Sequence, residues 1–173
     1  MCIKIYIMKK VLERFPENAR VRRLVAAEFL RLGLKVDGSG KVFVGKIEIP
    51  PAKIGRALGV DRRVVIETAR SILEDDKLLQ IFYRMESRAF IGNVAKELGF
   101  DTVEIRADPN KVGIVAAVTG ILADEGMAIR QVISDDPDMF PDPVLTIIIN
   151  GSISARAIKR LKASKVANSI SVR

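Results

Sequence analysis

Residues 101–134 read DTVEIRADPN KVGIVAAVTG ILADEGMAIR QVIS. At the start, apolar Val103 and Ile105 alternate with polar residues, which is the pattern of a half-buried strand. From Ile114 to Glu125 the apolar residues fall at helical spacing, and Gly126 is a natural helix stop. The next segment, 127–134, is expected to be a second strand. The quoted residues therefore predict strand, helix, strand.

The residues that follow extend this pattern to the carboxyl end. A nearly continuous apolar segment, Val144 to Asn150, predicts a central strand, because a strand buried on both faces needs no polar side. A helix is expected over 152–163 and a last strand over 166–172. The order strand–helix–strand–strand–helix–strand over residues 101–173 is the ferredoxin-like arrangement. Right-handed crossovers would place both helices on one sheet face and leave the other face free for a partner.

Upstream, residues 51–75 predict two helices joined by a tight turn. Proline is tolerated in the first turn of a helix, so the first helix is expected around 52–58, ending at Gly59. Asp61 is a good N-cap for a second helix over 62–73. This is a helix-turn-helix, whose second helix enters the major groove in DNA-binding proteins. The predicted DNA-binding residues are the cations of the two helices: Lys53, Arg56, Arg62, Arg63 and Arg70.

The second helix also has a structural interpretation. Arg63 and Glu67, like Arg70 and Glu74, stand four residues apart and could form ion pairs on a solvated face. An apolar stripe formed by Val65, Ile66, Ala69, Ile72 and Leu73 is expected to face the core.

The rest of the first half is expected to be mainly helical. Helical spacing runs from Met8 to Leu34 with a break near Pro16, and Leu24, Val25, Phe29 and Leu32 share one face. A hairpin is predicted over 35–49 because Asp37–Gly40 supplies turn residues between β-prone flanks. Two further helices are predicted over 76–85 and 88–98. The predicted domain covers 8–98, and residues 1–7 are interpreted as an extension before the true start.

Composition narrows the function. The 173 residues carry a net charge of +8, contain no histidine and contain one cysteine. That excludes an internal disulfide, most zinc sites and the usual Ser/His and Cys/His nucleophile pairs, so we expect no catalysis, no cofactor and no metal. The whole excess charge lies in residues 1–100, a distribution that favours a polyanionic partner. No apolar run is long enough for a membrane span, and we expect a cytoplasmic protein.

Residues Asp108 to Ile129 resemble the opening of an ACT domain, a small regulatory module that typically binds amino acids. The glycine before the first helix and the glycine before the second strand carry this resemblance. Together with the helix-turn-helix half, the chain is similar to archaeal predicted regulators of amino-acid metabolism. The expected fold class is α+β: a mainly helical (winged-)helix-turn-helix domain followed by a ferredoxin-like ACT domain.

This resemblance implies a ligand site in the loop before the first ACT helix. Asn110 and Asp108 would contact the head group of an amino acid, and the N–H groups of Gly113 and Ile114 would receive its carboxylate. Gln131 would approach the same pocket across a dimer interface. Two points weigh against this assignment: Asp108 and Asn110 are also ordinary turn residues, and Val112 stands where ACT domains often have proline.

The loop 135–143, with its four aspartates, lacks the glycine and terminal glutamate of a calcium loop, so no metal site is assigned to it. Met139 and Phe140 in this loop are expected to pack on a neighbouring subunit.

The resulting hypothesis is a ligand-responsive transcriptional regulator that forms a homodimer or a higher even oligomer. Its partners would be double-stranded DNA and an effector, expected to be an amino acid. Two alternatives remain open: a regulatory subunit that docks to a biosynthetic enzyme, and an RNA-binding or protein-binding module. The small number of aromatic residues argues against base stacking on a sheet.

Overall fold

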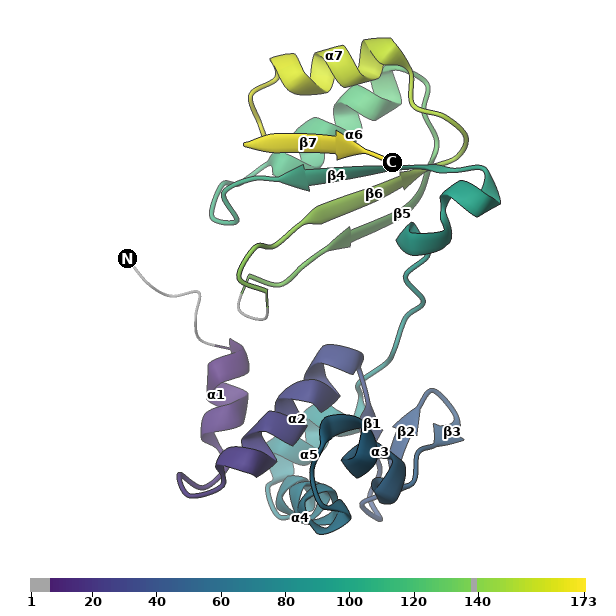
Figure 1. The fold of residues 1–173 in the computed structure, drawn as a ribbon. Coiled ribbons are helices and arrows are strands. Elements are labelled where there is room, and N and C mark those ends of the chain that lie inside the picture. Colours follow the sequence, from purple (N-terminus) through teal and green to yellow (C-terminus); the bar gives the residue numbers. More distant parts are fainter. Residues whose placement is uncertain (1–6, 138–139) are drawn as a thin grey trace. The chain divides into compact units, whose positions relative to one another are not determined.

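The structure is a computed structural model that describes residues 7–137 and 140–173, and the chain divides into two compact units, Met1–Ala89 and Phe90–Arg173 (Figure 1). The division lies before the predicted gap between residues 98 and 101. Residues 1–6, which make up most of the predicted extension, lie outside the described residues. None of the described helices is long and apolar enough to cross a membrane.

The N-terminal unit combines five helices of the described chain with a small sheet. The helices are α1 (Ile7–Glu13), α2 (Arg20–Leu32), α3 (Pro51–Leu58), α4 (Arg62–Leu73) and α5 (Asp76–Tyr83). The strands β1 (Lys35–Val36), β2 (Val42–Val44) and β3 (Ile47–Glu48) form an antiparallel sheet in that order. The predicted hairpin over 35–49 is therefore a three-stranded meander, because the chain turns a second time at Gly45 and Lys46.

The first turn of this meander forms as its residues predict. The Asp37 carboxylate accepts hydrogen bonds from the backbone N–H groups of Ser39 and Lys41, at 2.9 and 3.0 Å. Gly40 has a φ of 81°, a conformation that glycine adopts without strain.

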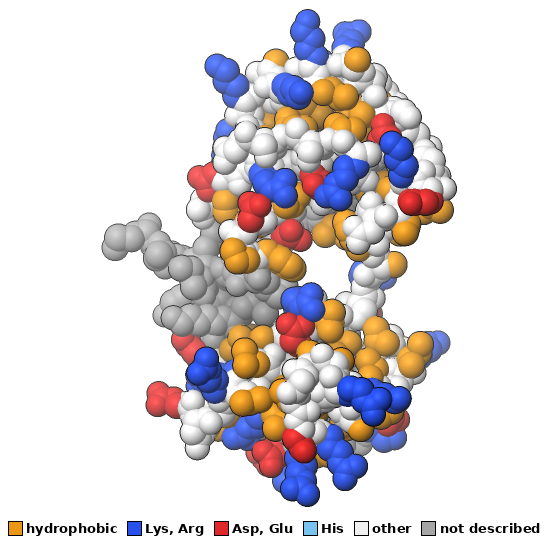
Figure 2. All heavy atoms as spheres, in the orientation of Figure 1, with side chains coloured by type: hydrophobic (Ala, Val, Ile, Leu, Met, Phe, Trp, Pro, Cys, Tyr) orange, Lys and Arg blue, Asp and Glu red, His pale blue; other side chains and the backbone are white. Residues whose placement is uncertain are grey.

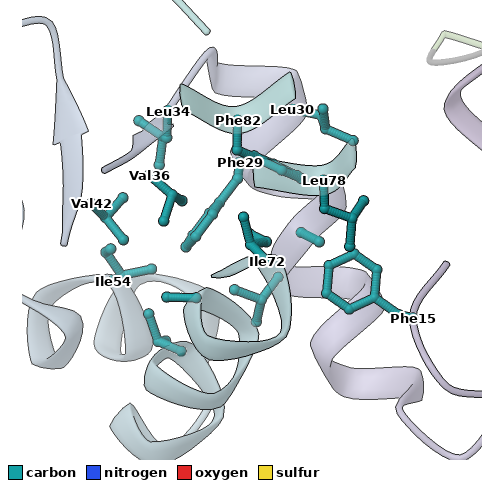
Figure 3. Packing of buried hydrophobic residues seen from close by; sticks show 14 of the residues in the cluster. Phe15, Phe29, Leu30, Leu34, Val36, Val42, Ile54, Ile72, Leu78 and Phe82 are labelled. Atoms are coloured by element: carbon teal, nitrogen blue, oxygen red, sulfur yellow. The ribbon is translucent and has the colours of Figure 1, made fainter. Parts of the chain in front are cut away.

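Aromatic and branched side chains from all five helices and from β1 and β2 form the core of the N-terminal unit (Figure 3). Phe29 and Phe82 meet edge to face, with ring centroids 6.5 Å apart. The predicted faces of α2 and α4 need correction. Leu24 and Leu32 are 60% and 45% exposed, and Ile66 is 43% exposed. The core instead takes Ala26, Leu30 and Thr68, because neighbouring helices approach these two helices from a direction that periodicity alone does not specify.

Hydrogen-bonding caps at the helix ends, together with a close backbone contact at Gly55, set the arrangement of α3 and α4. Gly59 ends α3 with a φ of 66°, and the Asp61 carboxylate caps α4 by accepting the Arg63 N–H at 2.7 Å. Gly55 lies against the start of α4: a Cβ atom placed there would be 2.7 Å from the Val60 carbonyl oxygen. The two helices are thus held together by direct backbone contact.

The predicted helix over 88–98 is wrong. That segment contains two short 3-10 turns, Gly92–Val94 and Lys96–Leu98. Only Ala95 of this segment is buried, so there is no apolar stripe that could hold a regular helix against a core. The Ile91 N–H instead donates to the Gln131 side-chain oxygen at 3.2 Å.

The C-terminal unit has the ferredoxin-like βαββαβ order that the sequence predicts. Its elements are β4 (Asp101–Arg106), α6 (Ile114–Asp124), β5 (Ile129–Ser134), β6 (Leu145–Ile149), α7 (Ala155–Ala163) and β7 (Ser169–Val172). The antiparallel sheet has the order β5-β6-β4-β7, and both helices cover one face (Figure 1). All residues of β6 are buried, as its continuous apolar run predicts.

The face of this sheet away from the helices is not fully open. Ile147 and Ile149 belong to the core under the helices, so the alternation of a strand turns Ile148 to the opposite face, yet Ile148 is fully buried. Gln131 pairs with Ile148 across β5 and β6 and binds Ile91. Residues 90–100 therefore occupy part of the face that we expected to remain free for a partner.

Candidate functional site

A pocket of about 420 Å³ opens at one edge of the C-terminal sheet. Strands β4 and β5 both run antiparallel to β6, so their carboxyl ends meet at the same edge. The loop from β4 to α6 contributes Lys111 and Gly113, and the end of β5 contributes Ser134 and Asp135. The topology thus brings together two loops that are far apart in sequence.

The start of α6 provides backbone donors to this pocket. Gly113 has a φ of 84° and precedes the helix without any side-chain cap. The first intrahelical bond is donated by Ala117, so the N–H groups of the first turn are not used within the helix. Ile114, Val115 and Ala116 line the pocket. A carboxylate at this position would gain hydrogen bonds and a favourable interaction with the helix dipole.

Two opposite charges also line the pocket. The Lys111 ammonium donates one hydrogen bond to the Lys165 carbonyl at 3.3 Å, which leaves two of its three protons for a ligand. The Asp135 carboxylate accepts the Val144 N–H at 3.1 Å with one oxygen. A cation, a carboxylate and a helix start are the groups that a zwitterion requires.

The ligand-binding residues that the resemblance to ACT domains implies divide into two groups. Gly113 and Ile114 line the pocket. Asp108, Asn110 and Gln131 are not among its lining residues: the Asp108 carboxylate accepts the Asn110 N–H at 2.9 Å, an ordinary turn, and the Gln131 side chain accepts the Ile91 N–H. The sequence alone predicted no ligand-binding role for Lys111, Ser134 or Asp135. Lys111 lies inside the predicted loop, but nothing local indicates that the end of β5 joins it.

Protein contacts engage the described aspartates of the acidic loop. Asp135 binds Val144, and the Asp142 carboxylate pairs with Arg106 at 2.8 Å, which ties the loop to β4. Within residues 7–137 and 140–173, no three acidic, cysteine or histidine side chains come together as a metal site. Asp138 and Met139 lie outside the described residues, and Phe140 is half-buried.

A second candidate surface lies on α3 and α4. The predicted DNA-binding residues are all exposed: Lys53, Arg56, Arg62, Arg63 and Arg70. Figure 2 shows Lys and Arg side chains over the end of the N-terminal unit where Figure 1 places α4, with carboxylates among them. The side chains predicted to bind DNA therefore have the solvent access that such a contact requires.

The ion pairs expected from spacing on α4 do not form. Among the salt bridges of the described chain, neither Arg63 with Glu67 nor Arg70 with Glu74 approaches within 4.0 Å. Other cations of the same unit are engaged: Arg14 binds Asp75 at 2.7 Å. The exposed arginines of α4 are thus unpaired in a unit that pairs several of its other cations.

No protein-family model and no curated protein sequence matches this chain. Among solved structures, one neighbour is the ligand-free regulatory subunit of aspartate kinase from Thermus thermophilus, with a TM-score of 0.38 and 19% identity over 44% of this chain and 51% of that chain. A second is PH0061, with a TM-score of 0.25 and 11% identity over 72% of this chain and 78% of that chain. The chain thus spans about half the length of the aspartate kinase subunit. At these scores, neither likeness decides what the chain does.

Proposed function

We propose that this chain is a ligand-responsive transcriptional regulator of amino-acid metabolism. The N-terminal unit binds double-stranded DNA through α4 as the recognition helix of a helix-turn-helix. The C-terminal unit is an ACT-like sensor that binds a small zwitterion, an amino acid, beside the start of α6. The chain itself is not catalytic in this proposal.

The unpaired arginine face of α4 is the observation that carries the proposal. A charge with no intramolecular partner contributes little to folding, whereas a guanidinium fork can bind phosphate or a guanine edge. The Asp61 cap presents Arg62 and Arg63 at the amino end of α4, the part of a recognition helix that lies nearest the bases.

The pocket supports the sensing half of the proposal. Its volume falls in the range of small-molecule sites, and its charges match the two ends of an amino acid. An effector changes DNA affinity only if it binds better to one arrangement of the molecule than to another. In a homodimer, the two recognition helices would read half-sites about 10 bp apart, or a multiple of that distance.

The DNA half is tested by replacing both arginines at the start of α4. In R62A/R63A, affinity for duplex DNA should fall about 10- to 100-fold. The slope of log affinity against log salt concentration should become shallower, by the amount that the loss of about two phosphate contacts produces. A matched control, R20A/K77A, removes two exposed cations elsewhere in the unit and should change affinity far less. Equal losses in both variants, measured by fluorescence anisotropy at two salt concentrations, would remove α4 from the interface.

The sensing half is tested by thermal shift with the twenty amino acids, because a ligand that binds the native state raises its melting temperature. Replacing Lys111 by alanine, or Asp135 by asparagine, should abolish the shift. Asn110→Ala is the control from the same loop, and its response should persist because Asn110 does not line the pocket. A shift lost in the control but kept in Lys111→Ala would place the ligand elsewhere.

A second candidate function is regulation of a partner enzyme by docking. Val21, Leu24 and Leu32 on α2 are 44%, 60% and 45% exposed, and such apolar side chains favour a protein contact. Co-purification of a protein partner without nucleic acid, together with no duplex binding, would favour this function. Gel shifts with RNA and with duplex DNA distinguish the RNA-binding alternative from DNA binding.

A further inference from the structure

A second pocket, of about 370 Å³, lies in the N-terminal unit and is separate in sequence from the α3–α4 surface. It opens between β1, the turn after β2, and the segment that follows α5. Its polar lining includes Lys35, Lys46, Tyr83, Arg84, Glu86 and Arg88. The sequence alone predicted no ligand-binding role for these residues.

The charges around this pocket are strongly unbalanced. Four cations face one carboxylate, and that carboxylate is already neutralised, because Glu86 pairs with Arg88 at 2.6 Å. Over residues 7–137 and 140–173, Lys46 and Arg84 have no ion-pair or hydrogen-bond partner for their side chains. Like charges gathered around a concave surface repel one another and raise the local concentration of anions.

Tyr83 adds an aromatic wall to the pocket. The Lys35 ammonium lies 4.3 Å from the centre of its ring, a cation–π contact, and Tyr83 itself is 52% exposed. An anion bound next to the Lys35 ammonium would compete with the Tyr83 ring for electrostatic interaction with that ammonium. Binding in the pocket would therefore change the surroundings of Tyr83.

We propose that this pocket binds the phosphate groups of a phosphorylated ligand. Arginine forks and lysine ammonium groups are the usual partners of phosphate, and several of them at one site suit a ligand with more than one phosphate charge. The volume matches a small molecule of nucleotide size. A neutral ligand would leave the charges of Lys35, Lys46 and Arg84 uncompensated.

This phosphate chemistry has two sources: a free nucleotide or the backbone of DNA. The pocket shares no lining residue with the set on α3 and α4, so the inference does not depend on the proposed recognition helix. The effect of R62A/R63A on DNA binding and the effect of the pocket variants on phosphate binding can therefore be tested independently.

The test uses the fluorescence of Tyr83 in the full chain. The protein has no tryptophan and two tyrosines, so Tyr6→Phe leaves Tyr83 as the one remaining tyrosine reporter. Inorganic pyrophosphate and ATP are titrated into this variant, with calorimetry in parallel. We expect saturable binding at one site per chain, accompanied by a change in tyrosine fluorescence.

The K46A/R84A variant should weaken this binding at least about 10-fold, because both side chains would donate charge-assisted bonds to phosphate. Both residues are exposed on the unit and unpaired, so the fold should survive, which the melting temperature checks. The matched charge control is again R20A/K77A, which should bind as the parent does. No saturable binding of either probe, or equal weakening in both double variants, would overturn the inference.

A third titration, with duplex DNA of about 20 bp, identifies the source of the phosphate. Displacement of pyrophosphate by DNA, with weaker DNA binding in K46A/R84A, supports the pocket and assigns it to the DNA backbone. ATP binding that is tighter than pyrophosphate binding and indifferent to DNA supports the pocket and assigns it to a free nucleotide.

Discussion

The two units of this chain use their charges differently. Met1–Ala89 holds 19 Lys and Arg against 11 Asp and Glu, whereas Phe90–Arg173 holds 10 against 10. In the second unit the cations connect elements: Arg106 ties the acidic loop to β4, and Arg160 on α7 binds both Asp124 and Glu125 at the end of α6. In the first unit, the described arginines of α4 and the side chains of Lys46 and Arg84 at the second pocket have no acidic partner. Surplus charge without an acidic partner thus indicates where the two proposed anionic ligands, DNA and phosphate, bind.

Particular glycines of the two units meet different constraints. In the N-terminal unit, Gly33 and Gly55 lie where another backbone segment approaches closely. In the C-terminal unit, Gly113 and Gly126 adopt positive φ values with no other atom within 4 Å of a Cβ placed there. Glycine is therefore required for both packing and conformation at Gly33, for packing at Gly55, and for conformation alone at Gly113 and Gly126.

Gly33→Ala should cause the largest loss of stability among the substitutions that test these differences. Gly33 has a φ of 65°, and a Cβ there would be 2.6 Å from the Glu86 carbonyl oxygen. The left-handed strain and the clash together should lower the free energy of unfolding by about 3 kcal/mol. Gly126→Ala, with a φ of 69° and open space, should cost about 1 kcal/mol.

Hydrogen exchange measures both variants in the full chain, at α2 for Gly33→Ala and at β6 for Gly126→Ala. Equal costs at the two positions would show that the close approach of Glu86 adds nothing to the glycine requirement.

Arg160→Met should have an intermediate effect, because it removes a cation that joins two helices. The Arg160 guanidinium binds Glu125 at 2.9 Å, and the Glu125 side chain is only 8% exposed. Glu125 keeps Arg156 at 3.2 Å, so the loss of stability should be smaller than that of Gly33→Ala. Arg20→Met removes an exposed cation of the other unit and should change stability by less than about 0.5 kcal/mol, as urea unfolding followed by circular dichroism can test.

Asp75→Asn should have the smallest effect, and one that depends on pH. The hydrogen bond from Arg14 lowers the pKa of the Asp75 carboxyl below its ordinary value of 3.8. A lowered pKa means that the charged carboxylate stabilises the folded unit above about pH 4, and that this contribution disappears as the pH falls through the folded-state pKa. Asparagine keeps the oxygen that caps α5 but not the charge.

Tyrosine fluorescence reports this effect, because both tyrosines belong to the N-terminal unit. In urea titrations the parent should be slightly more stable than Asp75→Asn at pH 7, and the difference should vanish in strong acid. A difference that is constant with pH would mean that the Arg14 contact contributes no charge-dependent stability.

Much of the fold could be predicted because its signals are local. The Asp61 cap, the Asp37 turn, the all-apolar β6 and the strand and helix order of the C-terminal unit all follow from neighbouring residues. The failures involve long-range contacts. Residues 88–98 have helical spacing but bury only Ala95, and α2 buries Leu30 instead of Leu24 because of where its neighbours lie.

The residues of the candidate pocket could likewise be predicted only where they form a local pattern. Gly113 and Ile114 could be chosen from the sequence because a glycine before a helix is a local pattern. Asp135 could not be chosen, since it reaches the pocket only because β4 and β5 end at the same sheet edge. Gln131 was a reasonable candidate by position, yet its side chain binds Ile91, a residue 40 positions away in sequence.

The amino-acid sequence by itself determined most of the helices, strands and turns of each unit and the confinement of the excess positive charge to one half. Hydrogen-bonding caps, side-chain periodicity and charge composition are properties of adjacent residues, so they need no knowledge of the fold. Only the tertiary structure decided which cations remain unpaired and which loops share a pocket. Those outcomes depend on contacts between residues far apart in the chain, and such contacts form only when the sheet order and the helix packing are complete.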